Sequence, residues 1–214
     1  MSQTSQDNIK RLDRLSRTMT AILRHRIKEH KLVMNAEGYV NLDSLLNLPD
    51  IKQFNPTLED VKYCVKNDNK NRFGFIEEAR LIRANQGHSV KGIIDYEKMM
   101  KLITAEDAPK YPEVLHGTYF EAYKIIKEQG LQPMSREQIH FAQGINAVSG
   151  IRKDCTVRIF IDLQQAINNG LKFYLSENGV ILTSDVVLPK YFTQTPSKIL
   201  LTSVLSSTSI IMLP

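Results

Sequence analysis

The chain has 214 residues, of which 42% are hydrophobic and 24% are charged, and its formal net charge is +5. This length suits two small domains or one large one, and the composition excludes an intrinsically disordered chain. The two cysteines, Cys64 and Cys155, are too few for a disulfide framework or a cysteine-rich zinc site, which favours a reducing compartment.

The sequence offers no membrane or export signal. No uncharged apolar run approaches the roughly 18 residues of a transmembrane helix, and the uncharged residues 203–214 form only a short segment rich in Ser and Thr. The first 17 residues lack the apolar block of a secretory signal. We therefore expect a soluble intracellular protein, cytoplasmic and/or nuclear, without a membrane partner.

A strongly basic segment lies near the N-terminus. Residues 1–100 carry 17 basic and 13 acidic side chains, whereas residues 101–214 carry 11 and 10. Within residues 9–31 only Asp13 and Glu29 oppose eight basic side chains, which favours a polyanionic partner. On charge alone, a solvated helix face explains the segment equally well. The eight are Lys10, Arg11, Arg14, Arg17, Arg24, Arg26, Lys28 and Lys31.

The first predicted element is a helix over residues 13–28. Its apolar residues recur at helical spacing and form one stripe that faces a core. They are Leu15, Met19, Ile22 and Leu23.

Shorter elements follow, each marked by an N-cap, a capping box or a β-rich run. They are a strand at 38–40, a helix from 42 that Asn41 caps and Pro49 stops, a helix opened by 57–60, and a hairpin of 72–76 with 81–84. Three helices followed by a hairpin are typical of a winged helix. Winged helices often bind nucleic acid but many mediate only protein contacts, so this fold does not settle function.

The second half predicts a strand-rich lobe. We assign residues 1–92 to the first lobe, 93–113 to a connector that contains Pro109 and Pro112, and 114–214 to the second lobe. The expected elements of the second lobe alternate little between helix and strand, which indicates an α+β fold. They are strands at 115–118, 139–141, 157–161, 173–175 and 179–183, and helices at 120–129, ended by Gly130, and at 164–168.

Several common catalytic motifs do not occur in the sequence. It contains no GxGxxG, P-loop, HExxH or GxSxG motif, so a Rossmann dinucleotide site, a P-loop NTPase, a zincin and an α/β-hydrolase lose support. His88, His116 and His140 are far apart and lack acidic neighbours at ligand spacing. We therefore expect no metal.

A set of arginines and histidines remains. Each has a structural explanation by itself: Arg24 extending along a helix, Arg72 capping the third helix, and His116 satisfied within a core. Taken together, several arginines near lobe edges suit a bound phosphate, because guanidinium groups bind its oxygens bidentately and keep their charge.

The motifs that hold these residues resemble the RNA 2′-phosphotransferase family, in its eukaryotic type from tRNA splicing. The matching stretches span residues 15–192 in the family's order. They are LSRTMTAILRHR (15–26), EGYVNLDSLL (37–46), VKNDNKNRFGF (65–75), LIRANQGHSV (81–90), LHGTY (115–119), MSREQIHFA (134–142), SGIRKDC (149–155), FIDL (160–163) and NGVILTSDVVLPKYF (178–192).

The resemblance implies an RNA-binding winged-helix lobe joined to an ADP-ribosyltransferase-like lobe that binds NAD. It also implies a reaction in which the 2′-phosphate of ligated tRNA is transferred to NAD through an ADP-ribosylated RNA intermediate. The products would be RNA with a 2′-hydroxyl, nicotinamide and ADP-ribose 1″,2″-cyclic phosphate. We expect RNA as the partner and a monomeric enzyme.

The family's functional positions carry over to two groups of residues. The expected catalytic residues are Arg24, His25, Arg72 and Arg136. The expected NAD-binding residues are His116, Gly117, Thr118, His140, Ser149, Gly150 and Arg152. Related protein-modifying transferases carry a Glu in the motif that corresponds to residues 179–183, which have none here. That difference argues against ADP-ribosylation of proteins, because a carboxylate would repel a phosphate nucleophile.

Two rival functions stay open at this stage. The first is an ADP-ribosyltransferase that modifies nucleic-acid ends, which would leave a stable ADP-ribosylated product. The second is a non-catalytic winged-helix binder of RNA or DNA, which would ignore NAD and tolerate the loss of Arg136 and His116.

Overall fold

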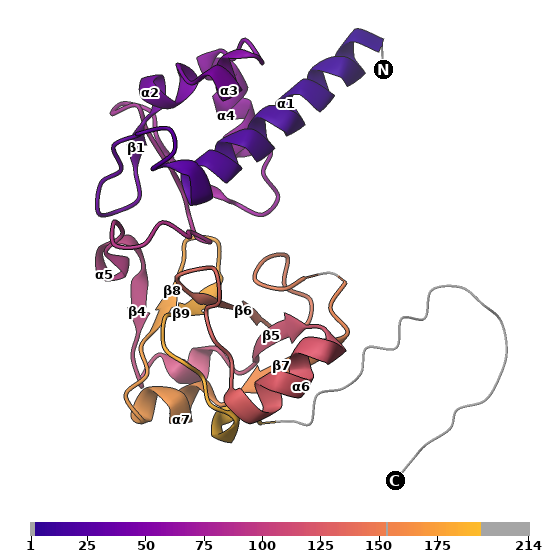
Figure 1. Cartoon of the computed structure of the whole chain (residues 1–214), viewed down its shortest axis with the longest axis vertical. Coiled ribbons are helices and arrows are strands. Elements are labelled where there is room, and N and C mark those ends of the chain that lie inside the picture. Colours follow the sequence, from indigo (N-terminus) through magenta and orange to yellow (C-terminus); the bar gives the residue numbers. More distant parts are fainter. Residues whose placement is uncertain (1–2, 153, 194–214) are drawn as a thin grey trace, which may run out of the picture.

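The computed structural model describes residues 3–152 and 154–193, which form two lobes (Figure 1). Each lobe has its own buried core, one built from residues between 12 and 90 and the other from residues between 103 and 191. All strand pairs of the named strands are antiparallel, so the expected α+β class is confirmed. The winged-helix and ADP-ribosyltransferase-like assignments stay predictions. Residues 203–214 and the end of the predicted second lobe lie outside the described residues.

The N-terminal lobe packs short helices on a three-stranded sheet of order β1-β3-β2. Its elements are α1 (Gln3–Ala21), a π-helical turn (Ile22–Arg26), β1 (Val40–Asn41), α2 (Leu42–Leu46), α3 (Pro49–Lys52), α4 (Leu58–Lys66), β2 (Phe73–Ile76) and β3 (Leu81–Ala84).

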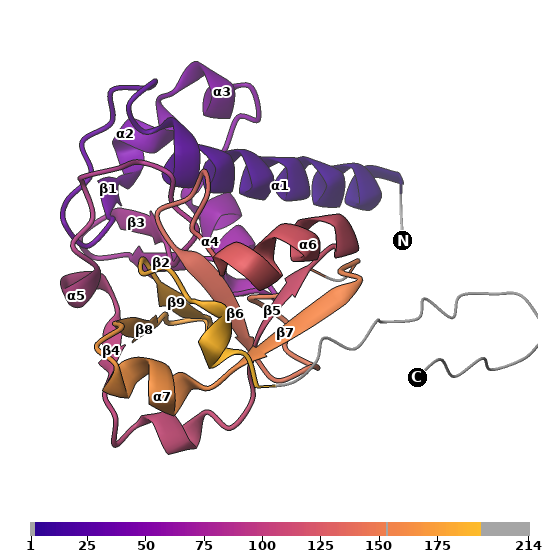
Figure 2. The same cartoon turned by 60° about the horizontal axis from the view of Figure 1, so that its bottom comes forward.

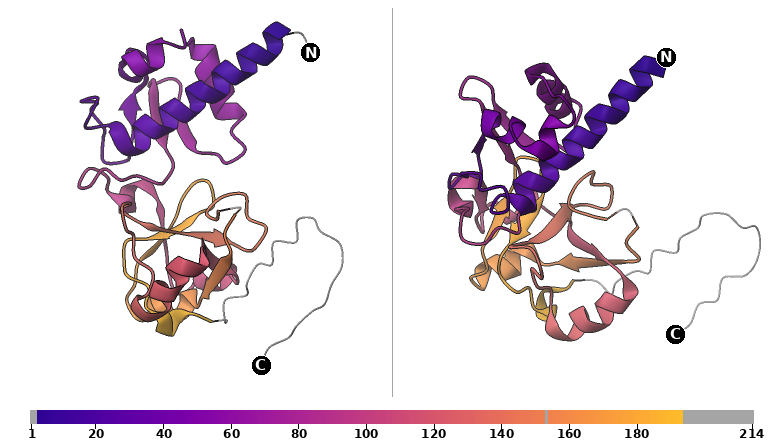
Figure 3. Two further views of the ribbon diagram at one scale, coloured as in Figure 1. Left: turned by 45° about the vertical axis from the view of Figure 1, so that its right-hand side comes forward. Right: turned by 45° about the horizontal axis from the view of Figure 1, so that its top comes forward.

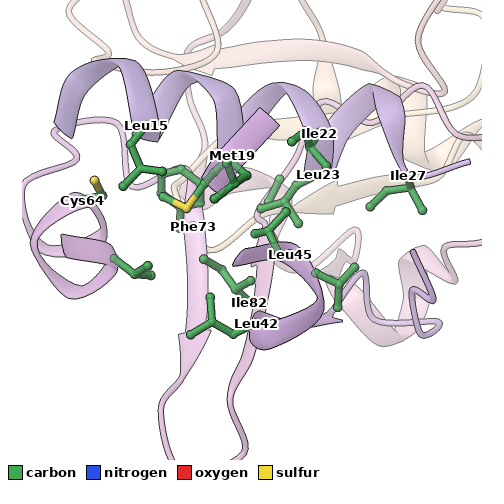
Figure 4. Packing of buried hydrophobic residues seen from close by; sticks show 14 of the residues in the cluster. Leu15, Met19, Ile22, Leu23, Ile27, Leu42, Leu45, Cys64, Phe73 and Ile82 are labelled. Carbon is green, nitrogen blue, oxygen red and sulfur yellow. The ribbon is translucent and has the colours of Figure 1, made fainter. Parts of the chain in front are cut away.

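The apolar stripe of α1 and the π-helical turn anchors this lobe. Figure 4 shows its side chains packed against those of α2 and of the sheet. Helix α1 begins ten residues before the predicted start. The sequence does not reveal these residues as helical, because residues 5–10 are exposed and carry no apolar stripe. The N-terminal end of α1 projects beyond the lobe (Figure 3). Among the residues that the structure describes, no helix has the length and apolar character of a membrane span. The stripe residues, all fully buried, are Leu15, Met19, Ile22 and Leu23.

The predicted caps of this lobe are confirmed. Asn41 Oδ1 accepts a hydrogen bond from the Ser44 amide at 2.9 Å, and Thr57 with Asp60 forms the reciprocal capping box of α4. Pro49 does not simply end a helix, however, since it begins α3. Proline lacks an amide hydrogen and therefore fits the first turn of a helix, where that hydrogen has no partner.

The C-terminal lobe is built on a six-stranded sheet of order β4-β8-β9-β6-β5-β7 (Figure 2). Apolar side chains of α6 and α7 pack against the core of this sheet. The predicted bounds of α6, β7 and β8 are confirmed, as is Gly130 as the end of α6. The elements are β5 (Val114–Thr118), α6 (Phe120–Gln129), β6 (Ile139–Gln143), β7 (Val157–Ile161), α7 (Leu163–Asn168), β8 (Phe173–Leu175), β9 (Ile181–Thr183) and a 3₁₀ turn (Pro189–Tyr191).

Residues 93–113, predicted as a connector, contain regular structure. Helix α5 (Tyr96–Met99) precedes β4 (Lys101–Ile103), and a 3₁₀ turn (Ala108–Lys110) follows. Strand β4 pairs with β8, placing Leu102 opposite Tyr174 at the edge of the sheet. A three-residue strand is too short to show alternation, and its partner lies far away in the sequence, so no local pattern indicates it.

Candidate functional site

A cavity of about 690 Å³ receives residues from both lobes. The N-terminal lobe contributes the π-helical turn, the residues before β2 and the segment after β3, and the C-terminal lobe contributes β5, β6, α6 and two loops. All the predicted site residues except His25 line this cavity. The separate motifs of the sequence therefore meet in one place.

The charge of the cavity lining has one sign. Within the part of the chain that the structure describes, the lining contains no carboxylate. Its cationic members are Arg24, Lys70, Arg72, Arg136 and Arg152. Such a lining attracts an anion with several oxygens, because the repulsion between the cations falls when the anion binds.

Arg24 lies on the π-helical turn that follows α1. Its Nε and Nη2 atoms are buried and have no hydrogen-bond partner among the described residues. Burial, and then the charges of Arg136 and Arg72, lower the pKa of Arg24 to about 10. The guanidinium is still a cation at neutral pH, and no carboxylate among the described residues forms an ion pair with it. π-Helical turns inside α-helices often occur at functional sites.

Asp68 holds Arg72 in place. The Arg72 Nε and Nη2 atoms lie 2.9 and 2.8 Å from Asp68 Oδ1, and the Arg72 amide donates to Oδ2. The Asp68 side chain is only 1% exposed. Burial by itself would raise the pKa of Asp68, but the hydrogen bonds from Arg72 outweigh it, so the pKa is lowered. Arg72 therefore reaches the cavity in a fixed orientation.

Arg136 is exposed at the cavity in the loop before β6. Partial loss of water, and then the charge of Arg152, lower its pKa. Met134, two residues earlier, has a φ of 58°, a conformation that bulky side chains rarely adopt. We call Arg24, Arg72 and Arg136 the arginine cluster.

His116 and His140, the histidine pair, are joined by a hydrogen bond and are neutral. His116 Nδ1 lies 2.9 Å from the His140 carbonyl oxygen. A carbonyl only accepts, so Nδ1 carries the proton and Nε2 of the neutral ring is an acceptor. Burial lowers the pKa of His116, and burial followed by Arg136 lowers the pKa of His140 to about 3. His140 Nε2 donates to Gln86 Oε1 at 2.8 Å.

The loop that carries Ser149, Gly150 and Arg152 packs closely on the sheet. A Cβ at Gly150, whose φ is +86°, would lie 2.8 Å from the Phe141 carbonyl oxygen. A Cβ at Gly117 would lie 2.6 Å from the Ile151 side chain. The missing side chain of Gly117 therefore lets this loop pack closely on β5.

Two further contacts fix the same loop. Ser149 Oγ donates to the Lys70 carbonyl oxygen of the other lobe at 3.3 Å, and the Arg152 guanidinium lies 5.5 Å from the centroid of the Tyr119 ring. Thr118 is buried at the end of β5, where its carbonyl oxygen accepts from the Thr156 amide at 2.9 Å.

His25 follows Arg24 but lies outside the cavity lining. Its side chain is exposed, and its Nδ1 lies 3.0 Å from Ser89 Oγ. Partial burial, and then the charges of Arg24 and Arg136, lower the pKa of His25. His25 is thus close to the arginine cluster, and its catalytic role stays a prediction.

Most of the basic segment at residues 9–31 has a structural role. Arg11 pairs with Asp60 and Arg26 with Glu29. Of its eight basic residues only Arg24 lines the cavity. A polyanionic partner for the rest of the segment stays a prediction.

Two cavity residues that sequence reasoning did not single out are Gln86 and Lys70. Gln86 stands in the RANQGHS motif at the junction of the lobes, so its position was the available signal. Lys70 stands two residues before Arg72 in a polar turn. No group of three or more potential metal-ligating side chains occurs in residues 3–152 and 154–193.

Comparison with known proteins gives a consistent match. Residues 10–185 match the model of the family described as RNA 2′-phosphotransferase, Tpt1/KptA family. A Schizosaccharomyces pombe relative is 38% identical over 188 residues, covering 84% of this chain but only 50% of that protein. The zebrafish protein named tRNA 2′-phosphotransferase 1 is 36% identical over 193 residues, covering 85% of this chain and 84% of that protein. Its human namesake is 37% identical over 190 residues, covering 83% and 73%.

Proposed function

The chain belongs to the RNA 2′-phosphotransferase family, and we propose that it removes the splice-junction 2′-phosphate of ligated tRNA by transferring it to NAD. The observation that carries the proposal is the cavity lining, which combines five cations, no carboxylate among the described residues, and a neutral histidine pair. The products are RNA with a 2′-hydroxyl, nicotinamide and ADP-ribose 1″,2″-cyclic phosphate.

In the first step a 2′-phosphate oxygen forms a bond to C1″ of the nicotinamide ribose, and the bond from C1″ to nicotinamide breaks. The nucleophile is already anionic, so the step needs no base. The arginine cluster holds the phosphate, and much of the rate comes from positioning it against C1″. The product of this step is RNA with ADP-ribose on its 2′-phosphate.

In the second step the ribose 2″-hydroxyl attacks phosphorus, and the bond from phosphorus to the RNA 2′-oxygen breaks. The hydroxyl loses a proton and the RNA oxygen gains one, so a group that can accept and donate a proton assists this step. His25 is our candidate for this proton transfer, with the Ser89 hydroxyl 3.0 Å from its Nδ1. Charge on the phosphoryl oxygens is stabilised by Arg24, Arg72 and Arg136.

The NAD side is assigned to the C-terminal lobe. The cavity volume of about 690 Å³ is within the ordinary range of ligand sites, roughly 300–1,000 Å³. The Nε2 acceptor of neutral His116 suits a ribose hydroxyl, and Arg152 suits a pyrophosphate oxygen. Gly117 and Thr118 supply backbone groups beside it, and Ser149 and Gly150 lie on the opposite loop.

The test is to incubate the protein with end-labelled RNA that carries one internal 2′-phosphate, with and without NAD. We expect loss of the phosphate only with NAD. Lys98→Ala, an exposed substitution on α5, is the control and keeps full activity. A stable ADP-ribosylated RNA would instead support the first rival. RNA binding without any reaction, unaffected by Arg136→Ala or His116→Ala, would support the second.

A further inference from the structure

The segment after β3, residues 85–89, is buried although it is a polar connection between elements. Asn85, Gln86 and His88 are exposed by only 2%, 9% and 2%. Connecting segments normally run over the surface, where water satisfies their polar groups. We call residues 85–89 the strap.

On its N-terminal side the strap holds the backbone that carries Arg72. The Asn85 amide donates to the Arg72 carbonyl oxygen at 2.8 Å, and Asn85 Nδ2 donates to the Asn71 carbonyl oxygen at 2.9 Å. The turn that presents Arg72 is thus attached to the strap at two successive peptide groups.

The other end of the strap holds the π-helical turn. The Ser89 amide donates to the Arg24 carbonyl oxygen at 3.0 Å, and Ser89 Oγ pairs with His25 Nδ1 at 3.0 Å. Between these ends, Gly87 has a φ of +89°, and a Cβ there would lie 3.3 Å from Arg24 Cζ and Nε. The strap therefore contacts both Arg24 and His25 of the π-helical turn.

The middle of the strap reaches the C-terminal lobe. Gln86 Oε1 accepts the hydrogen bond from His140 Nε2 at 2.8 Å, and the His88 carbonyl oxygen accepts from the Glu137 amide at 3.2 Å. Because Gln86 Oε1 only accepts, it keeps the His140 proton on Nε2. Gln86 therefore orients the His140 ring from the opposite lobe, whereas His116 bonds the backbone carbonyl of His140 and does not depend on that ring.

We propose that the strap positions both halves of the site, with Gln86 as the positioning residue for the His140 ring and Ser89 as the positioning residue for His25. The kinetic part of this proposal rests on the proposed function, whereas its structural part does not. Loss of the Gln86 acceptor frees the His140 ring and weakens NAD binding. Loss of the Ser89 hydroxyl frees His25 and slows the chemical step.

The first experiment does not depend on enzymatic activity, because it observes the histidine side chains directly. Long-range ¹H–¹⁵N spectra report the tautomer and titration of each histidine, assigned by single His→Asn variants. In Gln86→Met we expect the His140 signals to change and those of His25 to stay, and in Ser89→Ala the reverse. Unchanged His140 signals in folded Gln86→Met would overturn the role of Gln86, as unchanged His25 signals in Ser89→Ala would overturn that of Ser89.

A companion variant keeps the test decisive if Gln86→Met does not fold. Gln86→Glu retains an oxygen that accepts from His140 Nε2 and adds a negative charge beside it. We expect the pKa of His140 to rise in this variant, because the carboxylate favours the imidazolium. An unaltered His140 titration would contradict the contact.

The second experiment measures steady-state kinetics. Gln86→Met should raise KM for NAD roughly tenfold with kcat little changed, since one hydrogen bond is lost. Ser89→Ala should lower kcat by a similar factor at unchanged KM, and Ser89→Thr should restore it. Gln165→Met and Ser44→Ala, both at exposed positions, are matched controls. Equal changes of KM and kcat in both variants would overturn the separate roles of Gln86 and Ser89. An inactive wild-type protein would refute only the proposed function.

Discussion

The arginine cluster and the histidine pair line the same cavity but are held there in opposite ways. Arg24 has two buried nitrogen atoms without partners among the described residues, and its neighbours Arg136 and Arg72 repel it. His116 and His140 are neutral, and each ring donates one hydrogen bond. Arg24 on one side of the site is electrostatically unsatisfied, whereas the histidine rings on the other side have hydrogen-bond partners.

This difference supports the ligand that we propose for each side. A buried cation without a partner costs free energy, which an anionic ligand recovers by pairing with it. Neutral rings with fixed tautomers add no charge and instead define where a hydroxyl donor fits. The arginine cluster therefore suits the phosphate, and the histidine pair suits the sugar of a nucleotide.

The largest effect is expected when the arginine cluster loses Arg72. Arg72→Ala should reduce phosphate removal roughly 10²- to 10³-fold, because a preorganised cation is lost at the site of developing charge. The variant also takes the guanidinium partner away from buried Asp68, which keeps only backbone amide donors, at a cost of about 1–3 kcal/mol in the free energy of unfolding.

Arg72→Ala with Asp68→Asn removes that carboxylate and is the control for stability. Initial-rate assays and denaturant unfolding measure the two effects separately. Wild-type activity in either folded variant would contradict the role of Arg72 as a phosphate ligand.

The arginines of the cluster are expected to differ in the step that each one mainly assists. We expect Arg136→Ala to let ADP-ribosylated RNA accumulate, because Arg136 then mainly stabilises the second transfer. Gel analysis of the labelled RNA over time follows that species. A slower reaction in which it never appears would contradict this division of labour.

A substitution at Gly87 tests whether Arg24 depends on its close contact with the strap. Gly87→Ala places a Cβ beside the Arg24 guanidinium and strains a backbone with φ +89°, so we expect about 1–3 kcal/mol lost in stability and roughly tenfold slower turnover. Gly92→Ala has a similar φ of +78° but open space around it. Gly92→Ala should lose a similar free energy of unfolding but keep the wild-type turnover rate. Equal turnover in the two variants would show that Arg24 does not need this contact.

A smaller effect concerns pH and the buried histidines. Burial lowers the pKa of His88 and of His140 to about 3, from an ordinary value of 6.5. Between these values the unfolded chain binds more protons than the folded one, so stability rises with pH and levels off above about 6.5.

Each histidine adds a slope of up to about 1.4 kcal/mol per pH unit in that window. His88→Leu should reduce the slope by one such contribution, which denaturant unfolding at pH 4 to 7 measures. An identical slope in the variant would mean that His88 already titrates normally in the folded state.

Where the sequence carried a local signal, it predicted the fold well. Helix α6 has the predicted bounds because Gly130 ends it, and α4 begins at its capping box. Strand β4 was missed because its pairing with β8 is distant in sequence. The π-helical turn at Arg24 was also missed, since a widened turn has no composition of its own.

The site was predictable as a list of residues but not as an arrangement. The family resemblance supplied Arg24, Arg72 and Arg136, whereas nothing in the sequence shows that Arg24 lacks a partner while Asp68 holds Arg72. Gln86 stood within a quoted motif, yet its contact with His140 joins residues 54 positions apart. Such contacts depend on how the lobes meet.

We propose above that the phosphorus of the 2′-phosphate leaves the RNA and ends on the ribose of NAD. This proposal is tested most directly by labelling that phosphate alone with ³²P and following the label after reaction with NAD. We predict that the label leaves the RNA and appears in ADP-ribose 1″,2″-cyclic phosphate. Label found in inorganic phosphate, or retained in RNA that carries ADP-ribose, would contradict the account.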